Sequence, residues 1–174
     1  MRLAVALLGV LCAGLFAVTA NASTQDPRLD ALASSIDGRP MSVECVLKAE
    51  DPEMATVWGY TMRIPVNWVR VNATACAAAL DPTSDPLWRA LGILVVTHES
   101  YHQQLSYGAR WNEGKVECRA IRHFTVSAED LGYTADEAWA LMPYALFWHY
   151  QTAHNPLYAD PSCVVPHWLP PGEG

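Results

Sequence analysis

Hydrophobic positions follow two different periods along this chain, and the change of period divides it into two halves. Residues 41–47 alternate between apolar and polar side chains, and residues 56–64 and 68–71 are rich in β-branched and aromatic side chains. Both features predict β-strands, and a proline- and asparagine-containing turn would join the last two strands as a hairpin. A short amphipathic helix is expected earlier, at residues 28–36.

The second half of the chain has the pattern of helices. Pro86 stands where proline often begins a helix, Asn112 is a suitable N-cap, and Thr134 with Glu137 forms a capping box. The expected helices cover residues 87–105, 112–124 and 135–153. The predicted fold class is therefore α+β, with a small antiparallel sheet or hairpin followed by a helical half.

The first residues have the form of a signal peptide. Arg2 precedes an almost wholly apolar stretch at residues 3–18, and Ala20-Asn21-Ala22 matches a signal-peptidase site. The stretch is short for a membrane span, so we expect cleavage, secretion, and no membrane span in the mature chain. The expected division is residues 1–22 as a signal peptide, 23–40 as an N-terminal segment with a short helix, 41–163 as the domain and 164–174 as an irregular C-terminal tail.

Charge and cysteine content narrow the class of protein further. The net charge is −7, with no cluster of Lys or Arg, which argues against nucleic acid or an anionic membrane as a partner. Four cysteines follow the expected cleavage site, and in an oxidising compartment they would form two disulfides. Three connectivities are open. We favour Cys45–Cys76 and Cys118–Cys163, because each joins nearest neighbours along the chain.

The segment His98-Glu99-Ser100-Tyr101-His102 carries the chemistry. Residues four apart share one face of a helix, so His98 and His102 can direct their imidazoles at one ion. Zinc prefers such neutral nitrogen donors. Glu99 is rotated by about 100° from His98, which places it to act on a water as a general base rather than to bind the metal. The alternative is two unliganded histidines on a helix surface.

A third ligand is expected on the next helix. Glu113 and Glu117 also lie four residues apart and share a helix face, so one can bind the ion while the other orients a ligating histidine. The alternative is an acidic face exposed to solvent. Cys118 follows Glu117 directly, and a disulfide there would fix the ligand helix to the C-terminal tail.

These two segments together resemble the gluzincin metallopeptidases, which carry a His-Glu-x-x-His helix followed by a Glu-bearing helix. Asn112-Glu113-Gly114 is similar to the start of the Asn-Glu-x-x-x-Asp segment of the thermolysin group. The resemblance implies a zincin-like domain with Glu113 as the third zinc ligand and Glu117 in the place of the Asp that hydrogen-bonds a ligating histidine. The gap from His102 to Glu113 is shorter than in gluzincins, which leaves Glu117 as the alternative ligand.

The chain also resembles a group of small exported actinobacterial proteins of unassigned activity. Like this chain, they carry a His-Glu-Ser-x-His motif, a Glu-Cys pair and four cysteines. The likeness spans roughly residues 45–163 and implies no particular activity.

The function expected from these residues is a secreted zinc-dependent metallopeptidase with a peptide or protein as substrate. Candidates for the donor that stabilises the developing oxyanion are Tyr107, Tyr144, His149 and His154. One alternative is a secreted binding or structural module that zinc stabilises without turnover. Another is a metal-free exported scaffold held by its disulfides.

Overall fold

A computed structural model describes residues 24–61, 67–105 and 112–163, and its α+β architecture confirms the predicted class. The predicted signal peptide and the tail at residues 164–174 lie outside the described residues. The strands are β1 (Thr24–Gln25), β2 (Ser42–Val46), β3 (Gly59–Thr61) and β4 (Trp68–Asn72), and a 3-10 turn, η1, covers Pro52–Ala55. The helices are α1 (Pro27–Asp37), α2 (Ala73–Leu80), α3 (Pro86–Gln104), α4 (Glu113–Asp130) and α5 (Ala135–Ala153).

The sheet has the strand order β1-β2-β4-β3 and is mixed rather than wholly antiparallel. β3 and β4 pair antiparallel, as the predicted hairpin requires. β2 and β4 pair parallel, with Val43 beside Val69 and Cys45 beside Val71. All four of these side chains are buried. The parallel pairing lets both central strands turn their apolar residues to one face, where the helices cover them.

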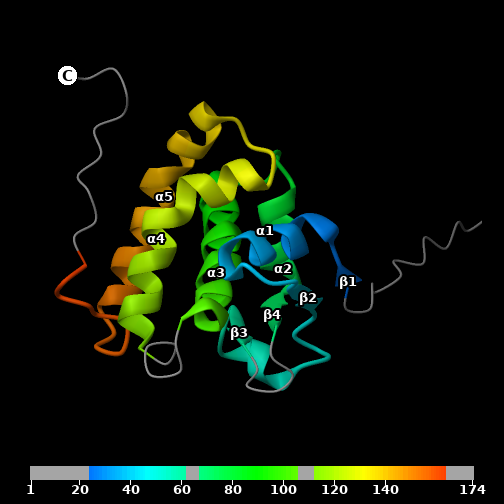
Figure 1. Cartoon of the computed structure of the whole chain (residues 1–174), viewed down its shortest axis with the longest axis horizontal. Coiled ribbons are helices and arrows are strands. Elements are labelled where there is room, and N and C mark those ends of the chain that lie inside the picture. The colour runs from blue at the N-terminus through cyan, green and yellow to red at the C-terminus, as the bar shows by residue number, and fades with distance from the viewer. Residues whose placement is uncertain (1–23, 62–66, 106–111, 164–174) are drawn as a thin grey trace, which may run out of the picture.

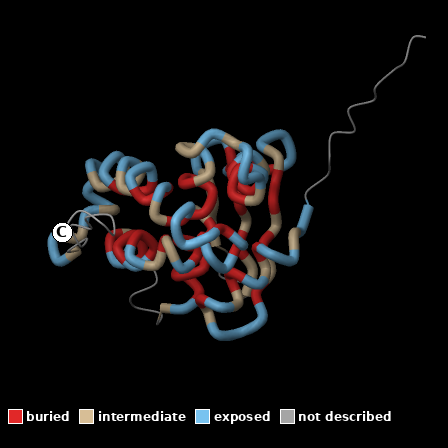
Figure 2. The backbone as a smooth tube through the Cα atoms, turned by 90° about the horizontal axis from the view of Figure 1, so that it is seen from above, coloured by how far each residue is buried: buried red, intermediate tan, exposed pale blue. Residues whose placement is uncertain are grey.

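Helix α3 lies at the centre of the molecule. It contacts α1 and α2 on one side, α4 and α5 on the other, and β3 and β4 at the sheet (Figure 1). Residues from Ala90 to Gln103 are buried except Val95, which is half-buried. Figure 2 shows the same distribution, with buried segments inside and exposed segments around them. The polar turns of α3 that carry the His-Glu-x-x-His motif are therefore in the interior, where each needs a partner.

The predicted caps are present at both later helices. Asn112 accepts a hydrogen bond from the Lys115 backbone N–H at 2.9 Å, and Thr134 with Glu137 forms the full capping box. Helix α4 continues to Asp130, beyond the expected end near residue 124. It does so because its buried face continues through Ser127 and Ala128.

Both favoured disulfides, Cys45–Cys76 and Cys118–Cys163, are formed. The first joins β2 to α2, and the second joins α4 to the segment after α5. Two disulfides in a chain of this size are consistent with an oxidising, extracellular compartment. Among the described residues, no helix has both the length and the apolar character needed to cross a bilayer.

Candidate metal centre

The middle of α3 changes from apolar to polar side chains without leaving the core. Thr97 and Ser100 meet the need for partners locally, since each hydroxyl donates to a backbone carbonyl one turn earlier, at 2.8 and 2.7 Å. Imidazole and carboxylate groups cannot do this and must find partners on other elements. His98, Glu99 and His102 form a buried group whose ligand atoms lie within 4.8 Å of one another, and this group could hold a metal ion.

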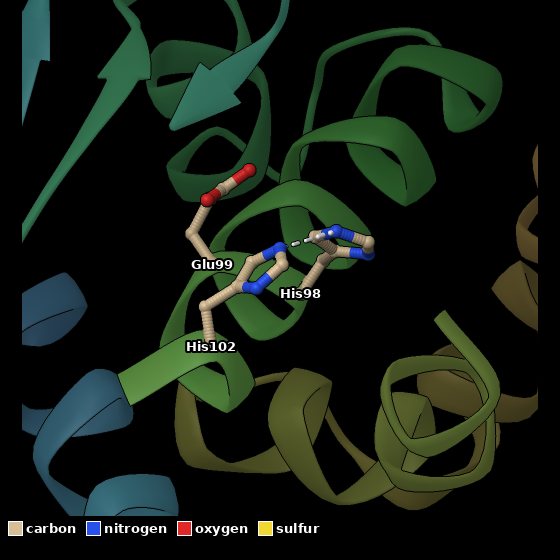
Figure 3. A group of neighbouring side chains, drawn as sticks. All are labelled: His98, Glu99 and His102. Carbon is tan, nitrogen blue, oxygen red and sulfur yellow. Dashed lines mark hydrogen bonds between the residues drawn. The ribbon is translucent and has the colours of Figure 1, made fainter. Parts of the chain in front are cut away.

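Three donor atoms meet in a small triangle at this point. Nε2 of His98 lies 3.1 Å from Nε2 of His102, and Oε2 of Glu113 lies 3.1 and 3.2 Å from these two nitrogens. Figure 3 shows the two imidazoles facing each other from successive turns of α3. Glu113 reaches them from the first turn of α4. The short His102–Glu113 gap therefore still brings the carboxylate to both rings.

The size of the triangle fits a small tetrahedral ion. Zinc binds imidazole nitrogen and carboxylate oxygen at about 2.0–2.2 Å, so its neighbouring donors lie about 3.3 Å apart. The observed separations of 3.1–3.2 Å are close to that spacing. A single proton can form a hydrogen bond between only two of the three atoms. A single cation at the centre of the triangle would contact all three. The donor set therefore has the spacing that a small tetrahedral metal ion requires.

Glu117 lies one turn further along α4 and contacts the other side of the histidines. Its Oε2 accepts from Nδ1 of His98 at 2.9 Å, and its Oε1 lies 3.1 Å from Nδ1 of His149 on α5. All three side chains are buried. A carboxylate that accepts Nδ1–H fixes the ring and leaves Nε2 free to bind. Glu117 thus orients His98, and His149 in turn holds Glu117.

Glu99 is not one of the three closest donors, although one of its carboxylate oxygens lies within 4.8 Å of a ring nitrogen of each histidine. Figure 3 shows its carboxylate extending from α3 toward the strand above it. That strand is β3, where a Cβ built on Gly59 would lie 2.9 Å from Cγ of Glu99 and 2.8 Å from Val95. Only glycine lets the backbone of β3 pass this close to α3, and the close approach confines Glu99 between helix and strand.

The site has a strong preference for positive charge. Burial alone would lower the pKa of His98, but hydrogen bonds to Glu113 and Glu117 raise it to about 10. Burial opposes ionisation of Glu113 as well, yet its hydrogen bonds to His102 and His98 hold its pKa at about 2. Burial is the main cause that raises the pKa of Glu99. Carboxylates thus dominate the electrostatics around the histidines.

A cleft of about 460 Å³ opens beside the triangle and reaches His98, Glu99 and Glu117. Residues 56–59, which lead into β3, form one part of the lining, and the C-terminal part of α5 forms another. Its apolar lining consists of Val57, Trp58, Leu91, Leu94, Val95 and Trp148. The nucleophile-activating candidate, Glu99, therefore borders a space that is large enough for a side chain and some backbone of a ligand.

The structure separates the predicted oxyanion donors from the cleft. Tyr144 is 39% exposed on α5, and Nδ1 of the exposed His154 bonds the Tyr150 carbonyl at 2.6 Å. His149 faces Glu117, as described above, and none of these three lines the cleft. Tyr107 lies outside the described residues.

Tyr158 lines the cleft instead, and the sequence interpretation did not include it. Its ring centre lies 6.0 Å from that of His98. Burial, with the charges of Glu113, Glu99 and Glu117, raises its pKa to about 12. The signal was indirect: a Cys118–Cys163 disulfide draws the residues before Cys163 toward the Glu-bearing end of α4.

Comparison of the chain with protein-family models, with curated proteins and with solved structures finds no match. The interpretation of the site therefore rests on its own geometry, and the relationship to metallopeptidases remains a prediction.

Proposed function

We propose that this protein is an exported zinc-dependent hydrolase that cleaves peptide bonds. His98, His102 and Glu113 would hold the ion, Glu117 would orient His98, and Glu99 would be the general base. The observation that carries the proposal is the buried triangle of donors 3.1–3.2 Å apart, next to a cleft that also exposes Glu99. A purely structural group of histidines and carboxylates would need no such opening.

His98, His102 and Glu113 would hold a zinc ion, which would supply Lewis-acid chemistry: it would polarise a carbonyl and lower the pKa of a nearby water to about 7. Glu99 stands beside the cleft, off the donor triangle, where it accepts the proton of the attacking water and then passes it to the leaving amine. Its position between α3 and Gly59 limits its rotamers, and the side chain lines the cleft. Glu117 would accept a hydrogen bond from Nδ1–H of His98, so that Nε2 is the nitrogen that would bind the ion.

The walls of the cleft favour a peptide substrate with a large apolar side chain. β3 is an edge strand among the described strands. The Trp58 carbonyl accepts from Asn72 of β4 at 2.8 Å, so the alternation of an antiparallel ladder turns the backbone groups of Gly59 to the open edge. An extended peptide can pair there. Leu94 and Trp148 line the cleft nearby and would contact a substrate side chain.

A second candidate is a zinc-stabilised binding module without turnover. One observation favours it: the donors come from α3 and α4, so an ion would crosslink two core helices, as structural zinc does. The two candidates differ in the part of Glu99. A structural site does not need this carboxylate, whereas hydrolysis does.

Glu99→Gln separates the candidates. We expect the variant to fold and bind about one zinc per chain, while hydrolysis of a fluorogenic peptide library falls by at least about 100-fold, because general base catalysis contributes at least that much. Glu50→Gln, at an exposed position, is the matched control and should keep full activity. Zinc-loaded wild-type protein that cleaves no peptide, with Glu99→Gln equally inert and equally loaded, would favour the binding module.

A further inference from the structure

We infer that Tyr158 is a catalytic residue of the proposed hydrolase, whose hydroxyl group donates a hydrogen bond to the substrate carbonyl oxygen as negative charge develops there. We infer further that the Cys118–Cys163 disulfide positions Tyr158. The inference rests on the proposed function and assigns to it a donor that the sequence did not reveal.

Tyr158 is carried by a short irregular segment, residues 155–163, which we call the C-terminal strap. Two tight turns shape it: the Tyr158 N–H donates to the Asn155 carbonyl at 2.9 Å, and the Cys163 N–H donates to the Asp160 carbonyl at 2.8 Å. The neighbours of Tyr158 are exposed, Leu157 to 71%, whereas Tyr158 is half-buried and lines the cleft. The strap thus turns this one aromatic side chain toward the metal centre.

The hydroxyl group of Tyr158 makes no hydrogen bond to any residue that the structure describes. A tyrosine hydroxyl usually finds a hydrogen-bond partner when it is buried. Here the nearby groups are the imidazole of His98, at 6.0 Å between ring centres, and the carboxylates around it. A neutral phenol between a cleft and a metal centre can donate to a ligand, and a donor so placed strengthens as the ligand oxygen becomes negative.

Two contacts fix the strap to the helix that carries Glu113. Cys163 is bonded to Cys118 on α4. At the first turn of α4, a Cβ built on Gly114 would lie 2.9 Å from the Ala159 carbonyl and 3.0 Å from the Asp160 nitrogen. The backbone next to Tyr158 therefore packs against the backbone next to Glu113. The segment that carries the donor is therefore attached to the helix that carries the third ligand.

The test compares Tyr158→Phe with Tyr144→Phe, a matched loss of one hydroxyl at an exposed position outside the cleft. Each variant is loaded with zinc, and three quantities are measured: zinc affinity by chelator competition, kcat and KM on a cleaved peptide, and calorimetric affinity for a phosphinic peptide with a Leu side chain. We expect Tyr158→Phe to keep its zinc affinity and KM. Its kcat should fall about 100- to 1000-fold, and its phosphinic-peptide affinity about 10- to 100-fold.

The part played by the disulfide is tested in a double-mutant cycle. Cys118→Ala/Cys163→Ala should lower kcat in the wild-type background but cause little further loss in Tyr158→Phe, because both act through one hydroxyl. If removal of the disulfide lowered kcat by the same factor in the wild type and in Tyr158→Phe, the disulfide would not act by positioning Tyr158.

An unchanged kcat and an unchanged phosphinic-peptide affinity in Tyr158→Phe would overturn the catalytic assignment while leaving the hydrolase intact. If the zinc-loaded wild type neither cleaves peptides nor binds the phosphinic peptide, the proposed function itself is contradicted and the assignment of Tyr158 falls with it.

Discussion

Glu113 and Glu117 show how one turn of helix gives two identical side chains different surroundings. Glu113 lies at the first turn of α4 and is half-buried. Its Oε2 faces the Nε2 atoms of both His98 and His102. Glu117 lies one turn deeper, is buried, and meets Nδ1 of His98 and Nδ1 of His149. If His98 and His102 bind the ion through Nε2, a third ligand must lie near these Nε2 atoms, and a group that orients His98 must contact its Nδ1. In the proposed site, Glu113 would therefore bind the ion and Glu117 would orient the His98 ring.

Alanine variants of the two residues should weaken zinc binding to different extents. Glu113→Ala removes a ligand and should abolish stoichiometric zinc at micromolar metal. Glu117→Ala removes only an orienting group and should weaken the affinity by about 10- to 100-fold. Chelator competition measures both, with Glu129→Ala, exposed on the same helix, as the control that should match wild type. Complete loss in Glu117→Ala with no effect in Glu113→Ala would mean that the roles are reversed.

At the scale of elements, the position of α3 depends on two glycines, one where a strand packs on side chains of α3 and one where the backbones of two helices approach each other. Gly59 lets β3 pass over Glu99, and Gly92 lets α2 cross α3. A Cβ built on Gly92 would overlap the carbonyl oxygen of Ala75 and lie 2.9 Å from the Ala79 nitrogen. The contacting atoms belong to the backbone of α2, so no side chain can rotate away to make room.

Gly92→Ala should therefore lower the free energy of unfolding by about 1–3 kcal/mol, the usual cost of forcing added volume into a packed core. Urea denaturation measures this change. Alanine has a higher helix propensity than glycine by about 1 kcal/mol. If Gly92→Ala caused no steric clash, it would therefore raise the free energy of unfolding by about this amount. Ala140→Ser, exposed on α5, is the control and should change stability by less than about 0.5 kcal/mol. A Gly92→Ala protein that is more stable than wild type would show that α2 and α3 are not packed this closely.

Local signals in the sequence predicted most elements of the fold. The cap at Asn112, the capping box at Thr134 and the i, i+4 spacing of His98 and His102 each depend on neighbours within one or two turns. The parallel pairing of β2 with β4 was not predicted, because it depends on contacts about 26 residues apart, such as Glu44 with Arg70. Long-range packing leaves no comparable periodic trace in one sequence.

The candidate site divides in the same way. The pairs on single helices, His98 with His102 and Glu113 with Glu117, were identified from spacing. The residues that come from distant segments were not assigned correctly from the sequence. His149 was a candidate oxyanion donor but contacts Glu117 from α5, and Tyr158 was not among the candidates. Both depend on how α5 and the C-terminal strap return to α4, which the Cys118–Cys163 bond helps to fix.

At the scale of the whole molecule, the other helices and the sheet surround α3, which carries the polar His-Glu-x-x-His motif. α1 and α2 pack on one side of α3, α4 and α5 pack on the other, and the sheet lies at its end near β3 (Figure 1). Around the site, this arrangement buries three histidines and two acidic side chains: His98, His102, His149, Glu99 and Glu117. Burying charge at this density is costly unless the groups are paired or bind an ion. A zinc ion at the donor triangle would offset that cost at the point where the carboxylates converge.

Zinc content tests the central claim most directly. The oxidised full-length wild-type protein is equilibrated with zinc, freed of excess metal by gel filtration, and analysed by inductively coupled plasma mass spectrometry beside His102→Ala. The donor geometry predicts about one zinc per chain in the wild type and none in the variant. A folded, disulfide-bonded wild-type protein that retains no stoichiometric metal would contradict both the zinc site and the hydrolase built on it.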